Sequence, residues 1–457
     1  MYCPYFFLVA AVHAHNFGKN QIQPNMDKKP SVVLFPIILF CSVFPYLNPV
    51  SAQDPAYKRS SLHLVLIGSK MFPQQEVVLK SWDNYPFPDK YNHHPVASKV
   101  MNPYAYEVTP EERAAFKGKS ESLVQTLVRD YVEESSAGLI GRETEDMPIR
   151  INKYIQETKL AHQLVAKWFN RDEKGKFNMQ LIQERGFYNA SDLDAKVAAG
   201  QVRGLAALGD AGEELINYTF VVFSQLKFVE NEPLARDFFE KAQAEAYKLA
   251  IPLLQEKALK TAQATYDRTK EGYSVWTKSW LYKLRWNEEI ANRFYTELWD
   301  NPQAFEQSDI FQMDYIGRDE ATTLVTFSLQ EKRSEEKVID IATVRNVDKV
   351  FAKLQREHDL FKPKVPVSTS EPITAKIGMK EGLEGGEAFE VLERYQDPVT
   401  GFQKYKVVGR VVADKEKVWD NRYNAGEPPA AGTPEQTGTL FIGPKRVQAG
   451  MLLRLVR

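Results

Sequence analysis

Two glycine-containing stretches have residue types that bind phosphate in other proteins. Residues 377–393, IGMKEGLEGGEAFEVLE, place four glycines within ten residues, before an apolar run. The second stretch, Gly118-Lys119-Ser120, matches the end of a P-loop, but Arg113 stands where that motif needs its first glycine. Phosphate-binding glycines open a helix, whose N-terminus holds the anion, whereas residues 377–393 lead into a predicted strand. We therefore predict that Gly382, Gly385 and Gly386 take positive φ in a tight connection.

Histidines and carboxylates could bind a metal if three of them met. After residue 52 the sequence has the histidines His63, His93, His94, His162 and His358. Only His93 and His94 are adjacent, with Asp89 nearby, and adjacent side chains rarely converge on one ion without a third ligand at suitable spacing. No HExxH motif occurs. The sequence predicts no metal and no cofactor, and it predicts a hydrogen-bonded, partly buried His358.

Nucleophilic and acid–base catalysis have weak support. The segment GYSVW, residues 272–276, lacks the final glycine of the G-x-S-x-G elbow. Carboxylate pairs such as Glu288-Glu289 and Glu335-Glu336 are typical of helix starts and solvated faces, and only their spatial separation would reveal a glycosidase. No catalytic residue is predicted. An extracytoplasmic hydrolase acting on glycan or peptide stays open as the alternative function.

Aromatic residues alternate along a predicted strand near residue 280. Trp276, Trp280, Tyr282 and Trp286 share one face of GYSVWTKSWLYKLRW. Such a face can stack on sugar rings or on a partner peptide, since it combines apolar area with polar handles. It can equally form core beneath the long alanine-rich helix predicted from Pro233 toward Arg268, since core is the commoner fate of large aromatic side chains. These four residues are the only candidate binding face, and the core interpretation is favoured.

The chain has 457 residues, 43% hydrophobic and 26% charged, with a net charge of −1. This composition is that of a globular protein with two or three domains. It lacks the basic excess of nucleic-acid binders, so no nucleic-acid partner is expected.

Residues 26–52 have the pattern of a signal peptide. Lys28 and Lys29 precede an uncharged run, and Val50-Ser51-Ala52 is a small-residue cleavage site. A membrane anchor is the rival interpretation, but three prolines interrupt that run. We expect cleavage between Ala52 and Gln53, no transmembrane segment in the mature chain, and residues 1–25 as a mis-called upstream extension.

Cleavage would remove Cys3 and Cys41, the only two cysteines. An exported chain without cysteine has neither disulfides nor thiolate ligands. This pattern favours the periplasm or the outer membrane of a Gram-negative bacterium over a eukaryotic secreted compartment.

Residues 53–361 mix helical and strand patterns, which predicts an α+β (mixed α/β) body, with a subdomain break near residue 231. Residues 62–69 and 76–82 are predicted strands, whereas residues 151–170 and 344–361 are each a predicted helix. Thr109 and Glu112 form the capping box of a further helix. An alanine-rich helix is predicted from Pro233 toward Arg268, kinked or broken at Pro252. The segment EKRSEEK, residues 331–337, is a predicted turn.

Residues 362–372 are proline-rich and predict a linker. Beyond it, residues 373–457 predict short strands of a small β-barrel. The strands contain the patterns G-x-x-F-x-V at 386–391, V-G-x-V at 408–411 and V-x-x-G at 447–450. In these patterns the tail resembles the SH3-like barrel of the flagellar-assembly T protein family, and the whole chain resembles exported envelope proteins of Bacteroidetes.

The resemblance implies an SH3-like β-barrel that follows the body, and it brings no catalytic residues. The expected function is a non-enzymatic binding or assembly module of the cell envelope. Its expected partner is another envelope protein or a surface polymer.

Overall fold

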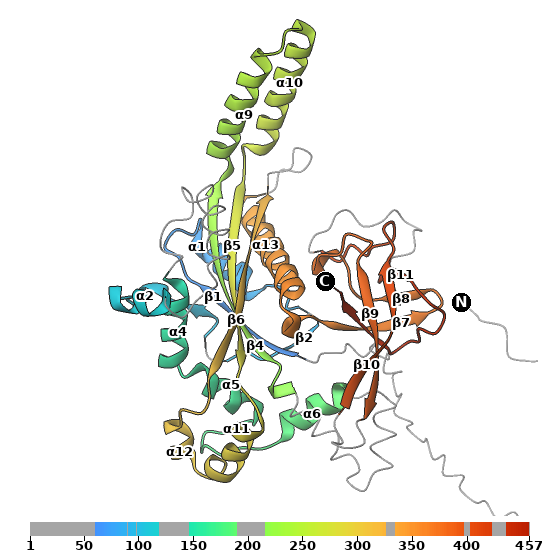
Figure 1. Ribbon diagram of the computed structural model, residues 1–457. Coiled ribbons are helices and arrows are strands. Elements are labelled where there is room, and N and C mark those ends of the chain that lie inside the picture. Colours follow the sequence, from blue (N-terminus) through green and yellow to red (C-terminus); the bar gives the residue numbers. More distant parts are fainter. Residues whose placement is uncertain are drawn as a thin grey trace, which may run out of the picture. The chain divides into compact units, whose positions relative to one another are not determined.

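A computed structural model of the chain describes residues 60–88, 90–96, 98–117, 146–189, 215–325, 334–396, 403–422 and 436–456. All of them belong to one unit, residues 53–457. The fold is an α+β body followed by a small closed β-barrel (Figure 1). The predicted cleavage site, Ala52 and Gln53, lies outside the described residues.

A six-stranded mixed sheet forms the centre of the body. Its strands are β1 Ser60–Ile67, β2 Tyr91–His93, β3 Val100–Met101, β4 Thr219–Glu230, β5 Tyr273–Leu284 and β6 Met313–Val325. The order is β2-β1-β4-β5-β6, and β3 also pairs with β1. β1 is parallel to β2, β3 and β4, whereas β4, β5 and β6 are antiparallel. β4 and β5 are therefore central strands, and both are rich in aromatic and β-branched residues that suit a buried pleated surface.

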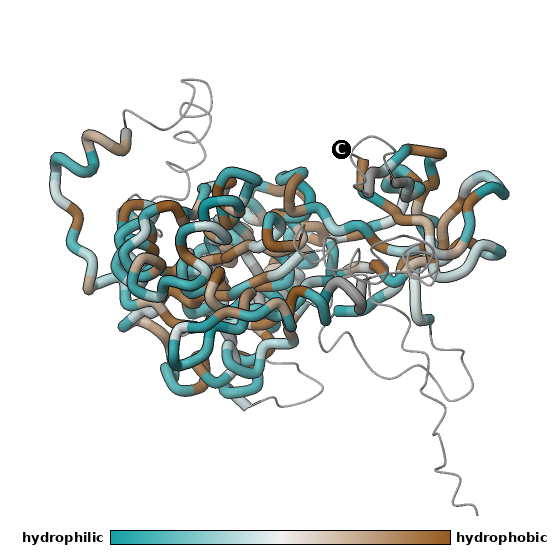
Figure 2. Tube along the Cα trace, turned by 90° about the horizontal axis from the view of Figure 1, so that it is seen from below, coloured by the Kyte–Doolittle hydropathy of each residue, from teal (hydrophilic) through white to brown (hydrophobic). Residues whose placement is uncertain are grey.

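Helices cover both faces of this sheet. The described body helices are α1 Gln75–Asp83, η1 Pro103–Ala105, α2 Pro110–Lys117, α4 Met147–Glu157, α5 Leu160–Trp168, α6 Gln180–Asn189, α9 Asn231–Tyr247, α10 Pro252–Thr269, α11 Glu288–Arg293, the π-helical turn η3 Phe294–Leu298, α12 Pro302–Gln307, α13 Glu335–Glu357 and η4 Asp359–Phe361. Side chains of α4, α5, α11 and η3 form the core on one face, and those of α1 and α13 form the core on the other. Figure 2 shows hydrophobic and hydrophilic residues alternating along much of the chain, as expected when elements bury one side and expose the other.

Several predicted elements are confirmed and others are corrected. The capping box is present, because the Glu112 amide donates to Thr109 Oγ1 at 3.3 Å and the Thr109 amide donates to Glu112 Oε2 at 2.8 Å. Residues 76–82 were wrongly predicted as a strand and form α1, in which Val78 and Trp82 are buried four residues apart on one helical face.

The helix predicted at 151–170 is two helices, α4 and α5. Lys159 between them takes the left-handed conformation with φ 50°, which ends the first helix. The predicted turn at 331–337 is partly helical, because Ser334 caps α13 through an amide hydrogen bond from Lys337 at 3.3 Å. The long helix predicted at 233–268 is indeed broken at Pro252, and the break produces a helical hairpin of α9 and α10.

The predicted subdomain break near residue 231 is wrong, because strands from both sides of it share one sheet. α9 and α10 are instead an insertion between two paired strands. β4 and β5 pair as far as Glu230 and Tyr273, and the hairpin leaves the sheet at that end. In Figure 1 the hairpin projects beyond the strands that carry it.

The C-terminal barrel is closed by six strands in the order β10-β11-β8-β7-β12-β9. They are β7 Lys364–Ser370, β8 Ile373–Ala375, β9 Ala388–Gln396, β10 Gln403–Ala413, β11 Thr439–Ile442 and β12 Leu452–Leu455. The predicted linker at 362–372 is therefore corrected, since most of it is β7, a member of the barrel. Its alternate residues Val365 and Val367 are buried in the barrel core, a period-two signal that the prolines obscured.

Candidate functional site

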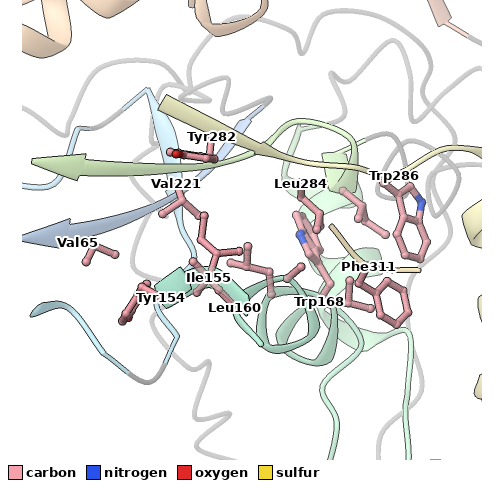
Figure 3. Close-up of a cluster of buried hydrophobic side chains, with 14 of the residues drawn as sticks. Val65, Tyr154, Ile155, Leu160, Trp168, Val221, Tyr282, Leu284, Trp286 and Phe311 are labelled. Carbon is pink, nitrogen blue, oxygen red and sulfur yellow. The ribbon is translucent and has the colours of Figure 1, made fainter. Parts of the chain in front are cut away.

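The aromatic face predicted on β5 is mostly core. Trp280, Tyr282 and Trp286 are buried among side chains from α4, α5 and η3, and Trp276 is half-buried. The prediction that the alanine-rich helix covers this face is wrong, because that segment forms α9 and α10, which contribute no residue to this core cluster. Figure 3 shows part of this cluster, where Ile155 of α4 lies beneath Val221 of β4. The fold thus brings three of the four residues together. They form part of the hydrophobic core and not a surface that a ligand can reach.

His63 of β1 and His94, which follows β2, serve as hydrogen-bonding core residues. His94 is fully buried, and Arg185 Nη1 donates to its Nδ1 at 2.9 Å, so its Nε2 donates to the Leu164 carbonyl at 3.1 Å. His63 Nε2 lies 3.2 Å from the Ser98 carbonyl. Burial lowers the pKa of His63 to about 4 and holds the pKa of His94 well below its usual value. Both imidazoles are therefore neutral at pH 7.

His93 shares no ion site with His94, because His94 uses both ring nitrogens within the protein. Within the described ranges, no group of three histidine, cysteine, aspartate or glutamate side chains could hold a metal ion. The predicted partner of His358 is present, since its Nε2 lies 3.2 Å from Asp319 Oδ2. Gly317 of β6 makes room for this ring, because a Cβ there would lie 2.2 Å from His358 Cε1.

The carboxylate pairs considered for acid–base catalysis are helix starts. Glu288 and Glu289 lie in the first turn of α11, and Glu335 and Glu336 lie in the first turn of α13, all exposed. Negative charge at a helix N-terminus complements the helix dipole. The residues Gly118-Lys119-Ser120 lie outside the described part of the chain.

The glycine-rich stretch has the predicted geometry and a structural role. Gly382, Gly385 and Gly386 have φ of 79°, 96° and 94°. Residues of this stretch contact α13, because Arg356 donates to the Gly382 carbonyl and Lys380 Nζ lies 3.7 Å from Asp348 Oδ1. Burial raises the pKa of the Asp348 carboxyl to about 6, and Lys380 partly offsets this increase. The stretch therefore connects barrel to body. Its described helical turn, η5 Met379–Glu381, has only three residues, and the amide of its N-cap Gly378 donates to Glu381 Oε2 at 2.8 Å.

The strongest candidate for a binding site is the α9–α10 hairpin, whose base is fixed to the sheet. Asn231, the first residue of α9, is buried, and its amide donates to the Gly272 carbonyl at 3.0 Å. Its side chain donates to the Glu271 carbonyl at 3.1 Å and accepts from Ser274 Oγ at 2.8 Å. One residue thus joins the start of α9 to the chain that enters β5, so the hairpin leaves the sheet in a defined direction.

The two helices of the hairpin contact each other along small residues. Ala235, Ala246 and Ala262 are buried although most of the hairpin is exposed. Small side chains let the helix axes approach closely. The rings of Phe239 and Tyr266 are in contact at a tilt of 41°, with centroids 5.4 Å apart, and Tyr266 Oη donates to Glu232 Oε1 at 3.0 Å. The hairpin is therefore a packed pair, and not two independent helices.

The outer surface of the stalk is mostly polar, although Phe238 of α9 is 57% exposed, and many of its charged side chains are paired. Ion pairs lie within each helix, for example Arg236–Glu232 at 2.5 Å, Lys241–Asp237 at 2.7 Å and Lys260–Glu256 at 2.8 Å. Each such exposed pair contributes only about 0.3–0.5 kcal/mol. Their main effect is to keep the stalk of the hairpin solvated.

The end of the hairpin is apolar, in contrast to its stalk. We call residues 247–254, YKLAIPLL, the hairpin tip. All eight residues are exposed, and Lys248 is the only charged one. The exposed fractions reach 60% for Tyr247, 55% for Ile251 and 74% for Leu253. Contiguous exposed apolar residues are typical of interaction sites, which makes the tip the candidate binding surface.

The local sequence explains how the tip forms. α9 ends at Tyr247, and Ile251 is extended with φ −103° and ψ 116°, as expected before a proline. Pro252 then occupies the first position of α10, where its missing N–H costs nothing. Sequence reasoning found the break at Pro252 but missed the tip. The available signal was the apolar run itself, which interrupts two stretches rich in charged residues.

Comparison with known proteins provides no identification, since neither a protein-family model nor a curated protein matches this chain. Across the residues that the structure describes, no helix is long and apolar enough to cross a membrane.

Proposed function

We propose that this protein is an exported, non-enzymatic docking protein of a bacterial cell envelope, and that the hairpin tip is its contact with another envelope component. The observation that carries the proposal is the exposed apolar run at 247–254, held on a polar stalk that is fixed to the central strands. Water favours burial of such a run, so attachment at the tip is favourable without any change in the body.

Two features of the sequence support the envelope assignment. Residues 26–52 have the pattern of a signal peptide, and the chain after Gln53 has no cysteine. The resemblance of residues 377–457 to SH3-like modules of envelope assembly proteins supports the same role. Amino-terminal sequencing of the exported chain tests this assignment directly: the sequence should begin at Gln53, and retention of residues 1–25 would contradict it.

Fractionation of cells that make the chain tests the role of the tip. The triple variant Ile251→Ser, Leu253→Ser, Leu254→Ser removes most of its apolar area. The matched control is Met71→Ser with Ile442→Ser, which changes exposed apolar residues elsewhere, 81% and 64% exposed. We expect the wild type and the control in the envelope fraction and the triple variant in the soluble fraction. An unchanged distribution of the triple variant would refute the proposed role of the tip.

A further inference from the structure

The shape of the hairpin tip restricts what can bind it. Its apolar residues belong to the end of α9, to the link and to the start of α10, so they do not share one helical face. A helix that docks in a protein groove uses anchors spaced three or four residues apart on one face. Side chains that diverge from a convex end fit a fluid apolar phase better, since such a phase needs no matching shape.

The charges around the tip match a phospholipid surface. Residues 241–260, which comprise the tip and six residues on either side, contain the lysines 241, 248, 257 and 260 and the glutamates 245 and 256, a net charge of 4 − 2 = +2. Lys241, Lys248 and Lys260 pair with Asp237, Glu245 and Glu256 at 2.7, 2.6 and 2.8 Å. Such exposed pairs are weak, so these lysines can exchange a carboxylate for a phosphate at little cost. Lysine side chains near an apolar segment extend toward phosphate headgroups while their methylene chains stay in the apolar layer. Tyr247 adds an amphipathic ring of the kind enriched at membrane interfaces.

The dimensions indicate shallow insertion. Eight residues fall well short of the roughly 20 that a membrane-spanning helix needs. α9 has 17 residues, which corresponds to a length of about 25 Å at 1.5 Å per residue. The stalk is therefore long enough to keep the sheet in solvent while the tip lies among lipids.

We propose that the hairpin tip inserts into one leaflet of a phospholipid bilayer. This inference rests on the proposed function, because it assigns a chemical class, a lipid surface, to the envelope component that the tip contacts. Leu253 and Ile251 enter the acyl region, Tyr247 lies at the headgroup level, and the flanking lysines face the phosphates.

Co-sedimentation with vesicles of phosphatidylethanolamine and phosphatidylglycerol tests the proposal on the purified protein. The triple variant Ile251→Ser, Leu253→Ser, Leu254→Ser should bind at least about tenfold more weakly than the wild type, because it loses most of the inserted apolar area. The control with Met71→Ser and Ile442→Ser should bind like the wild type. Thermal unfolding of all three proteins checks that they are folded.

An environment-sensitive fluorophore locates the contact. In the proposed mature chain, residues 53–457, which has no cysteine, a single cysteine is introduced either as Leu253→Cys in the tip or as Ala264→Cys on the stalk. Ala264 is exposed and lies about 16 Å along α10 from Leu253. Vesicles should shift the emission of the label at 253 to the blue and leave the label at 264 unchanged.

Three results would overturn the lipid inference. The first is equal vesicle binding by the wild type and the triple variant. The second is a tip-dependent dimer in the absence of lipid, which would assign the tip to a second copy of this chain. The third is loss of envelope attachment by the triple variant in cells although the wild type does not bind vesicles. That third result would leave the proposed function intact and assign the tip to a protein or a surface polymer.

Discussion

The aromatic strand β5 and the hairpin tip are both rich in large apolar side chains, yet the structure treats them in opposite ways. β5 pairs with β4 on one side and β6 on the other, and helices cover its faces, so Trp280 has no exposed surface. The tip lies at the far end of a connection between two strands, where Leu253 is 74% exposed. Position in the topology, more than composition, decides which apolar segment is core and which is a surface.

The base of the hairpin and the core around β5 also differ in whether their buried polar groups are hydrogen-bonded. At the hairpin base, Asn231 satisfies three groups of the connection around Gly272. In the core, the indole Nε1 of Trp280 is buried and, among the described residues, has no hydrogen-bond partner. The core thus accepts an unsatisfied donor in exchange for packing, whereas the hairpin depends on a few specific hydrogen bonds for its orientation.

The largest expected effect comes from the core. Trp280→Ala should lower the free energy of unfolding by about 3–5 kcal/mol, because it leaves a large cavity between the sheet and its helices. Trp280→Phe is the matched control, and it should cost less than about 1.5 kcal/mol since it keeps a ring and removes the unpaired N–H. Urea unfolding followed by circular dichroism measures both. If Trp280→Ala lowered the free energy of unfolding only slightly, Trp280 would not be an important part of the hydrophobic core.

The fold was more predictable from the sequence than the candidate site. Strands such as β1, β9 and β10 were predicted because alternation and β-branched residues are local signals. The sequence failed where tertiary context decides, as in α1, whose consecutive residues Val77, Val78 and Leu79 suggest a strand. It also failed at β7, whose prolines suggested a linker.

The tip escaped prediction for a related physical reason. Exposure depends on what lies beside a segment in space, and the alanine-rich pattern at 233–268 was compatible with a helix packed on the sheet. Only the pairing of β4 with β5 up to Glu230 and Tyr273 shows that the inserted residues must leave the sheet. For the aromatic face, the favoured interpretation as core is confirmed for Trp280, Tyr282 and Trp286. Its alternation alone could not decide this, because alternation says which residues share a face but not whether that face is covered.

Acid should weaken the core through a buried imidazole. The pKa of His63 is about 4 in the folded chain and 6.5 in the reference state. The unfolded chain therefore binds the extra proton first, so stability is full above pH 6.5 and is lost as the pH falls to about 4. The difference of 2.5 units corresponds to about 3 kcal/mol.

His63→Gln supplies the control, since glutamine does not titrate in this range. Between pH 6.5 and 4, the wild type should lose about 3 kcal/mol more stability than the variant in urea titrations. Asp348 acts in the opposite sense, because its raised pKa of about 6 makes the folded chain bind the proton first. Its contribution is the same in both proteins and cancels in the difference. Parallel pH profiles would show that His63 is not buried in solution.

The base of the hairpin should show an intermediate effect. Asn231→Ala removes the side-chain bonds to the Glu271 carbonyl and to Ser274 Oγ. Leaving these buried groups unpaired should cost about 1–3 kcal/mol. Hydrogen exchange should speed up in α9 and α10 more than in β4 and β5, since the bonds connect the hairpin to the sheet. Asn292→Ala, at an exposed asparagine of α11, is the control. Uniform acceleration across the body would contradict a local role for Asn231.

The smallest effect on stability should come from the tip, although it is the most apolar exposed segment of the hairpin. Leu253→Ser should change the free energy of unfolding by no more than about 0.5 kcal/mol, because the side chain of Leu253 is mostly solvated in the folded chain and loses little packing. Thermal and urea unfolding measure this change beside Trp280→Ala. A loss above about 1 kcal/mol would show that Leu253 packs within the folded chain. In that case its exposure would no longer support docking. We expect a free energy of unfolding that is almost unchanged in Leu253→Ser, together with loss of envelope attachment in the triple variant. This combination is the one expected of a binding surface that does not contribute to folding.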